Sequence, residues 1–130
     1  MKQNFVKKAL VIVTFLFSVF LASAQIPDEI VTSLKTGNAS GLSDYFNQNI
    51  ELFVLDQDDV YSKAQAQQIV SSFFDQYKAT GFSIIHQSGK EDTQYAIGNL
   101  TTNKGVFRVS FLVKNDRGKP VIHQLRIEKQ

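Results

Sequence analysis

The stretch that decides the fold runs from Tyr61 to Gln87, "YSKAQAQQIVSSFFDQYKATGFSIIHQ", because the spacing of its apolar residues changes partway along. As far as Tyr77 they recur every three or four positions, which predicts an amphipathic helix with one buried stripe. From Phe82 onward apolar and polar residues alternate, which is the period of a β-strand. The helical stripe consists of Ala66, Ile69, Val70, Phe73, Phe74 and Tyr77. We interpret this stripe as core rather than as a ligand-binding surface.

Both ends of this long helix carry sequence signals. Ser62, followed three positions later by Gln65, predicts a capping box in which the two residues satisfy free amide groups of the first turn. Gly81 predicts where the helix ends. Upstream, a helix beginning near Pro27 and a second one over Ala39–Phe46 are predicted, followed by a strand over Ile50–Leu55.

Downstream of Gly81 the alternation returns three more times. The connections contain glycine, asparagine, aspartate and proline, which favour turns, so the sequence predicts a four-stranded antiparallel meander. The four segments are Phe82–Gln87, Thr93–Leu100, Val106–Lys114 and Val121–Glu128. Gly98, inside the second segment, predicts a bulge or sharp bend. The whole order predicts an α+β fold with helices packed on one face of a curved antiparallel sheet.

Residues 1–24 have the features of a signal peptide. Three lysines precede an uncharged, mostly apolar run over Ala9–Ala24, and Ala22–Ala24 fits the small-x-small cleavage rule, so Gln25 is the expected mature N-terminus. The strongly apolar part is shorter than the roughly 20 residues of a spanning helix, although an uncleaved anchor is the alternative. We therefore expect an exported protein, periplasmic or secreted, with no membrane attachment after cleavage.

Residues 25–130 are expected to form a single domain without cysteine chemistry. The chain contains no cysteine, so disulfides, thiolate metal sites and a lipid-modified cysteine are excluded. Of its 14 basic residues three lie in the leader, which leaves 11 against 12 acidic residues and a net charge of −1. A nucleic-acid partner is not expected, because duplex binding needs a concentrated basic face.

Four polar residues are candidates for a pocket on the inner face of the sheet. Alternation from the apolar neighbours predicts that His86 and His123 point inward, and a short turn near Asn103 predicts the same for Tyr95 and Asn99. One alternative is a cavity in which a histidine acts as a general base while a tyrosine or second histidine stabilises an oxyanion. The other is a set of buried polar groups that only hydrogen-bond to one another or to backbone. No aspartate shares this face, which favours the second alternative, and no catalytic residue is assigned.

A second candidate site is the outward face of the last two strands. Arg108, Leu112, Ile122 and Arg126 are predicted to form a docking surface for an acidic partner or a second copy, the alternative being a solvated charged surface. A symmetric hairpin places Arg108 opposite Arg126, which is unfavourable, whereas a register shifted by two residues places it opposite Glu128.

The remaining polar signals are weak. The run Asp56–Asp59 lacks the spacing, central glycine and closing glutamate of a calcium loop and is predicted to be an exposed turn. Two histidines on separate strands are too few for a zinc site unless carboxylates join them. We therefore expect neither a metal nor a cofactor.

The chain resembles the exported bacterial domain-of-unknown-function family 4783, within the nuclear transport factor 2-like (cystatin-like α+β) superfamily. The segments that carry the resemblance are Ala66–Tyr77, Phe82–Lys90, Tyr95–Thr102, Phe107–Lys114 and Ile122–Lys129. The resemblance implies a cone-shaped sheet wrapped on the long helix, and dimerisation through the outer sheet face is frequent in that superfamily. The catalytic acids of its enzymes have no inward match in this chain, and a fold alone does not define an activity.

The favoured function is an exported, non-catalytic binding or protein-interaction domain, whose partner is an unknown small hydrophobic ligand or a protein. A homodimer through the outer sheet face is one form of this. The rival is an isomerase-like or dehydratase-like enzyme that uses polar residues in the cone for proton transfer. The enzyme requires an open cone, whereas the interaction domain requires a filled cone and a half-exposed apolar outer face.

Overall fold

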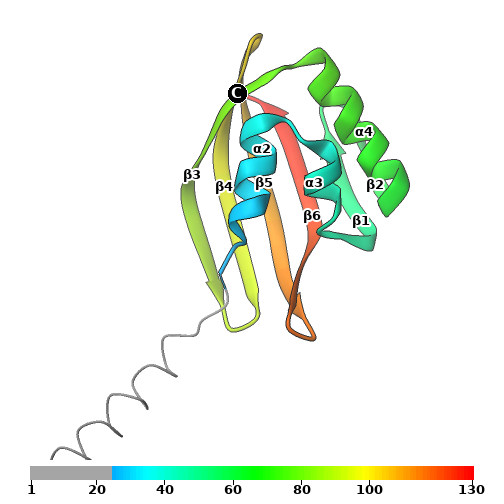
Figure 1. Ribbon diagram of the computed structural model, residues 1–130, viewed down its shortest axis with the longest axis vertical. Coiled ribbons are helices and arrows are strands. Elements are labelled where there is room, and N and C mark those ends of the chain that lie inside the picture. The colour runs from blue at the N-terminus through cyan, green and yellow to red at the C-terminus, as the bar shows by residue number, and fades with distance from the viewer. Residues whose placement is uncertain (1–24) are drawn as a thin grey trace, which may run out of the picture.

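The computed structural model describes residues 25–130, so the predicted signal peptide lies outside the described residues. Figure 1 shows a single sheet with the helices gathered on one face, which confirms the predicted α+β class. The elements in chain order are α2 (Asp28–Thr36), α3 (Ala39–Ser43), β1 (Phe46–Val54), β2 (Gln57–Ser62), α4 (Lys63–Gln76), β3 (Ala79–Lys90), β4 (Thr93–Thr102), β5 (Gly105–Asp116) and β6 (Lys119–Lys129).

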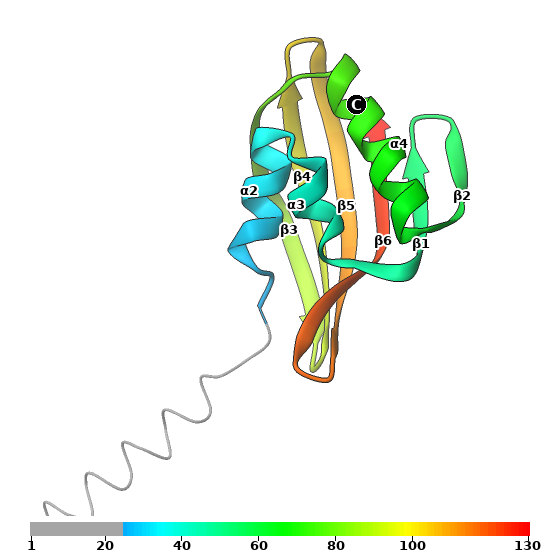
Figure 2. The same cartoon turned by 45° about the vertical axis from the view of Figure 1, so that its right-hand side comes forward.

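The sheet has six strands in the order β2-β1-β6-β5-β4-β3. Strands β3 to β6 form the predicted antiparallel meander. Strand β1 lies parallel to β6 and antiparallel to β2, so β6 is covered on both sides. Figure 2 shows α2, α3 and α4 lying on the same side of the curved sheet. We call the side covered by these helices the inner face and the opposite side the outer face.

Strand β2 was not predicted. It pairs only with β1, and its side chains are exposed or half-exposed, so it has no alternating buried residues to mark it. Asp58 and Asp59 lie in this strand, and the prediction that they belong to an exposed turn was wrong. Charged residues are common on edge strands because they discourage pairing with another chain. Strand β1 also begins earlier than predicted, at Phe46, which had been assigned to the end of a helix.

The capping box at the start of α4 is confirmed. The amide of Gln65 donates to the Ser62 hydroxyl at 3.2 Å, and the Ser62 amide donates to the Gln65 side chain at 3.4 Å. The helix ends at Gln76 rather than at Gly81. Tyr77 leaves the helical conformation, with φ −121° and ψ 96°, and its ring stacks on Phe73 with centroids 5.0 Å apart. Aromatic packing thus ends the helix before the glycine is reached.

Large apolar side chains fill the space between sheet and helices. The inward residues of β5, which are Phe107, Val109, Phe111 and Val113, are at most 3% exposed, as alternation predicted. Leu34, Val70 and Phe73 cover them from the helices. Within residues 25–130 no buried side-chain nitrogen or oxygen lacks a hydrogen-bond partner. The inner face therefore forms a packed core rather than a polar cavity.

The length of one turn decides which side of β4 faces this core. Thr102 pairs with Gly105 across a two-residue turn, so Leu100 lies opposite Phe107. In this register every odd-numbered residue of β5 faces an even-numbered residue of β4. Ala96, Gly98 and Leu100 are buried for this reason, and Tyr95 and Asn99 point to the outer face. The predicted inward orientation of Tyr95 and Asn99 was wrong by one position.

Two bulges change the orientation of the histidines. On β6 the register shifts between Gln124, opposite Leu112, and Ile122, opposite Val113, which leaves His123 as the extra residue. On β3 a shift between Ile84 and His86 has the same effect. A bulge inserts one residue and so reverses the alternation of side chains. Neither histidine points into the core, contrary to the prediction.

Gly98 lies beneath the ring of Phe82 rather than at a bulge. A Cβ atom at position 98 would lie 2.4 Å from Cζ of Phe82 and 2.6 Å from the Ser83 carbonyl oxygen. The predicted bulge occurs instead on the neighbouring strand β3, next to Ile84, which pairs with Gly98. Glycine at this position leaves room for the Phe82 ring.

Candidate functional site: the outer face of the sheet

The four residues predicted to line an inner pocket all lie outside the core. His86 pairs with Ile97 at the edge of the sheet and is exposed. Tyr95 lies between Ser88 and Leu112 and is half-buried.

The other two also belong to the outer side. The Asn99 side chain accepts a hydrogen bond from the Gln130 amide at 2.6 Å. His123 borders a shallow depression of about 310 Å³ together with Leu112, Lys114 and Gln124. The structure gathers the four residues on one face but joins them in no common cavity.

Of the four residues predicted to form a docking surface, three are on the outer face. Leu112 is half-buried between the strands, Arg126 lies opposite Ser110, and Arg108 is exposed. Ile122 is 0% exposed and belongs to the core, so its predicted position was wrong. The bulge at His123 is the cause, because it turns Ile122 inward.

The outer face has a half-exposed apolar centre. Tyr95 and Leu112 are direct cross-strand neighbours, as are Ile97 and Ser110 in the next row. In the same row, Arg126 on β6 lies opposite Ser110, and Phe53 on β1 lies opposite Arg126. None of Tyr95, Ile97, Leu112 and Phe53 packs against the core cluster, yet all are only half-exposed. Neighbouring side chains on the outer face therefore shield part of one another's surface from solvent.

Charged and polar side chains surround this apolar centre and are paired with one another. Arg126 forms an ion pair with Glu128, and its Nε donates to Glu128 at 3.0 Å. Gln124 donates to the Glu51 carboxylate at 3.0 Å. Arg108 lies opposite Glu128, which is the shifted register that charge repulsion favoured. The ion pair nevertheless forms with Arg126, two residues along the same strand.

Phe53 and Ile97 are members of this face that sequence reasoning missed. No face was predicted for Phe53 in the strand Ile50–Leu55, and Ile97 shares by alternation the face that was predicted to point inward for Tyr95 and Asn99. The outward position of Ile97 could have been predicted from the turn Asn103-Lys104, because a two-residue hairpin fixes the register between β4 and β5.

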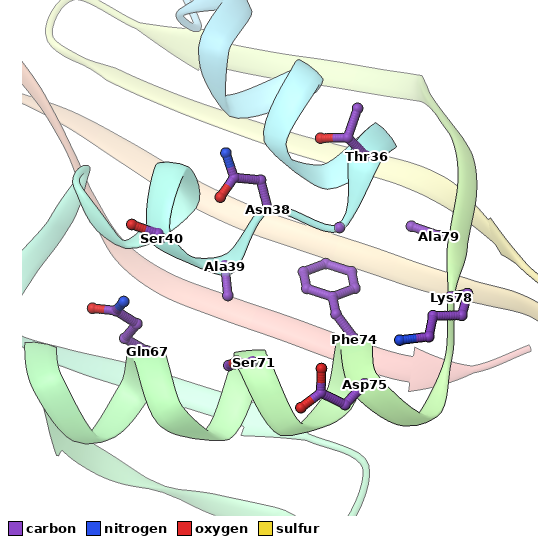
Figure 3. Close-up of a pocket in the computed structure, with 11 residues that line it drawn as sticks. Thr36, Asn38, Ala39, Ser40, Gln67, Ser71, Phe74, Asp75, Lys78 and Ala79 are labelled. Carbon is purple, nitrogen blue, oxygen red and sulfur yellow. The ribbon is translucent and has the colours of Figure 1, made fainter.

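A groove between the helices is the second concave feature. It has a volume of about 400 Å³ and lies between α4 and the α2–α3 connection. Figure 3 shows the ring of Phe74 projecting toward this connection, with Asp75 and Lys78 beside it. Polar residues form most of the walls, and the Asn38 side chain is already used as the helix cap that accepts from the Gly41 amide at 3.0 Å. Phe74 is only 5% exposed, so the groove offers little apolar surface to a ligand.

A third depression, of about 480 Å³, lies where β1 ends beside the last residues of β6. It is more apolar than the groove between the helices, because Phe53, Leu55 and Tyr77 form its walls. Within residues 25–130, no group of three or more His, Asp or Glu side chains gathers in a way that could hold a metal ion.

Tyr45 makes a polar contact on the helix-covered side. Its hydroxyl donates to the Glu29 carboxylate at 2.7 Å and so connects the start of α2 to the residue before β1. This hydrogen bond, followed by burial and by the negative charges of Glu29 and Asp44, raises the pKa of Tyr45 above its ordinary value.

No helix in the described part of the chain is long and apolar enough to cross a membrane. A six-stranded curved sheet wrapped around a long helix, with its inner face filled, defines a nuclear transport factor 2-like α+β domain. A family model described as "Domain of unknown function (DUF4783)" matches residues 27–128. The chain belongs to the DUF4783 family.

Solved structures agree with this assignment. A DUF4783 protein from Bacteroides ovatus has 31% sequence identity and a TM-score of 0.77, over 81% of this chain and 96% of its own. One from Bacteroides fragilis has 31% identity and a TM-score of 0.76, over 82% of this chain and 100% of its own. An NTF2-like protein of unknown function from Cytophaga hutchinsonii shares the fold at 15% identity, with a TM-score of 0.56 over 80% and 90% of the two chains. No curated protein matches the chain.

Proposed function

We propose that this chain is an exported, non-catalytic interaction domain, and that its outer sheet face binds a second copy of the same domain. The observation that carries the proposal is the combination of a filled inner face with a half-exposed apolar outer face. A row of sheltered apolar side chains on a surface is typical of protein contacts. Tyr95 and Leu112 at its centre are residue types that bury large apolar areas.

The packed inner face argues against the enzyme alternative. Proton transfer in the cone requires a histidine or tyrosine that reaches a bound substrate. His86, Tyr95 and His123 all lie on the other side of the sheet, and Phe107, Phe111 and Leu125 occupy the space in which a substrate would lie. No observation of the described residues favours catalysis over binding.

The charges of the outer face support a second copy over a strongly charged partner. Arg108, Lys114 and Arg126 are accompanied by Glu51 and Glu128, so both signs are interspersed. A face of mixed charge can oppose its own image about a two-fold axis, because cations of one copy can meet anions of the other. An acidic partner, considered from the sequence, would find Arg126 already paired with Glu128.

Sedimentation velocity of residues 25–130 tests the proposal. We expect a dimer that dissociates on dilution, and we expect Leu112→Glu to sediment as a monomer because it places an unpaired charge at the centre of the contact. Ile85→Glu is the matched control, since Ile85 is 57% exposed on the edge strand β3 and the same change there leaves the dimer intact. A wild-type monomer at every concentration, or equal effects of the two substitutions, would overturn the proposal.

A further inference from the structure

The depression where β1 ends has a lining of its own that the proposed function does not use. Strand β1 stops at Val54, whereas its neighbour β6 continues to Lys129. The gap is bordered by Phe53, Leu55, Asp56, Tyr77, Glu128 and Lys129 and has a volume of about 480 Å³. We propose that it binds a small aromatic anion, such as an aromatic carboxylate. This inference does not rest on the proposed association through the outer face, although Phe53 borders both sites.

The aromatic wall of this pocket is held rigidly before any ligand arrives. The ring of Tyr77 stacks on Phe73 at 5.0 Å, with 25° between the ring planes, and meets the edge of Phe107 at 4.8 Å. On the opposite wall the guanidinium of Arg126 lies 4.4 Å from the ring centroid of Phe53. Because both rings already have packing partners, the binding of a ligand removes less side-chain entropy from the protein. Flat rings also favour a flat apolar ligand. The volume also falls within the roughly 300–1,000 Å³ of small-molecule sites.

Leu55 supplies the third apolar wall in an unfavourable backbone conformation. Its φ is 59°, in the left-handed region that a bulky side chain rarely adopts. The chain maintains this conformation through the hydrogen bond from the Leu55 amide to the Ile127 carbonyl at 3.0 Å. Asparagine or glycine would fit this turn position with less strain. Glu91 and Arg117 have the same positive φ at the first position of their two-residue turns, so the conformation belongs to the hairpin. At the β1–β2 turn it places an apolar side chain at the edge of the pocket.

The charges around the pocket favour an anion. Lys129 borders it directly, and the ammonium group of Lys104 lies 5.6 Å from the centroid of the Tyr77 ring. The carboxylate of Glu128 is paired with Arg126. Asp56 is the other acidic residue on the border and has no ion pair among the described residues, so Lys129 on the border and Lys104 beside Tyr77 outnumber this one unpaired carboxylate. A negative group beside the rings would gain from this imbalance.

NMR titration of residues 25–130 with naphthoate tests the assignment. This part of the chain suits the experiment because its core cluster, from Ile30 to Ile127, lies wholly within it. We expect saturable amide shifts at Leu55, Tyr77 and Lys129. Naphthylmethylammonium, which has the same rings and the opposite charge, should bind at least about fivefold more weakly because the lysines repel it.

Substitutions distinguish a specific binding site from a nonspecific apolar contact with the ligand. Lys129→Glu should weaken naphthoate binding about fivefold, since it reverses a charge at the border, whereas Lys119→Glu makes the same change at the β5–β6 turn and should have no effect. Leu55→Asn should weaken binding about threefold without loss of stability, because asparagine tolerates the left-handed conformation. Leu55→Gly provides a second test at the same position.

The outcome is distinguishable from that of the proposed association. Leu112→Glu should abolish dimers and leave naphthoate binding unchanged. Shifts confined to Tyr95 and Leu112, no saturable shift at all, or equal binding of the cationic analogue would each overturn the assignment of the pocket.

Discussion

The guanidinium of Arg126 lies 4.4 Å from the ring centroid of Phe53 and at the same time forms an ion pair with Glu128. The cation–π contact joins two strands that run parallel, β1 and β6, across the outer face. Both residues that Arg126 contacts, Phe53 and Glu128, border the depression at the end of β1.

We expect Arg126→Ala to lower the free energy of unfolding by about 1 kcal/mol, because it removes both a cation–π contact and a partly exposed ion pair. Arg126→Lys should restore part of this, since a lysine keeps the charge but not the planar stacking. Urea denaturation of residues 25–130 measures both changes. Arg108→Ala is the control, because Arg108 is exposed and has no ion pair among the described residues. Equal losses for the two alanine variants would contradict the role given to the Phe53 contact.

Gly98→Ala is expected to destabilise the domain by about 2 kcal/mol or more, since the added methyl group would overlap the Phe82 ring and the Ser83 carbonyl. Gly81→Ala is the matched control, because no atom lies within 4 Å of a Cβ atom at position 81. Thermal unfolding distinguishes the two. The double variant with Phe82→Leu should recover part of the loss, and a failure to recover any would show that the backbone contact alone causes it.

The hydrogen bond between Tyr45 and Glu29 predicts a specific dependence on alkaline pH. Because the pKa of Tyr45 is raised, the folded protein retains a proton that the unfolded chain loses near pH 10. The stability from this contact is therefore fully present below about pH 10 and is lost as the pH rises through the higher pKa of the folded state. NMR of the Tyr45 ring carbon bonded to the hydroxyl measures the titration. Glu29→Gln should bring the pKa back toward its ordinary value, and an unchanged titration would refute the contact.

Expression of the whole chain in a Gram-negative host tests the expectation of export. We expect the protein in the periplasmic or secreted fraction, with a mass that places its N-terminus at Gln25. Ala24→Leu should block cleavage, because the signal peptidase site requires a small residue at that position. Recovery of the uncut chain in the cytoplasm would contradict both expectations.

Local signals predicted where the helices begin better than where they end, since α4 stops at Gln76 and Phe46 belongs to β1. Gly37 adopts the left-handed conformation with φ 70° and ends α2, and Ser62 with Gln65 begins α4, because each of these features depends on a few neighbouring residues. The meander was also predictable, because turn residues and the alternation of apolar and polar residues can be recognised in short stretches of sequence. Strand β2 was not, because an exposed edge strand has no buried side chains to leave a pattern.

The candidate site was harder to predict because it depends on single-residue shifts. The two-residue turn at Asn103-Lys104 places Tyr95 outward, and the bulge residue His123 turns Ile122 inward. Alternation has a period of two, so one inserted residue moves every later side chain to the other face. Neither bulge has a glycine or proline at the inserted position that could have marked it. Tyr95, Asn99, Ile122 and the two histidines were therefore predicted on the wrong side of the sheet.

The position of β6 has a consequence for how the chain acquires its structure. β6 comes last among the described strands, yet it lies between β1 and β5 and joins the first hairpin to the meander. The ribosome synthesises β6 after the other five described strands, so until then the two halves of the sheet are linked only through the helices α2, α3 and α4. Pairing over such sequence separation is slow. If the chain is exported as we propose, its precursor would meet a translocation channel before the sheet has closed.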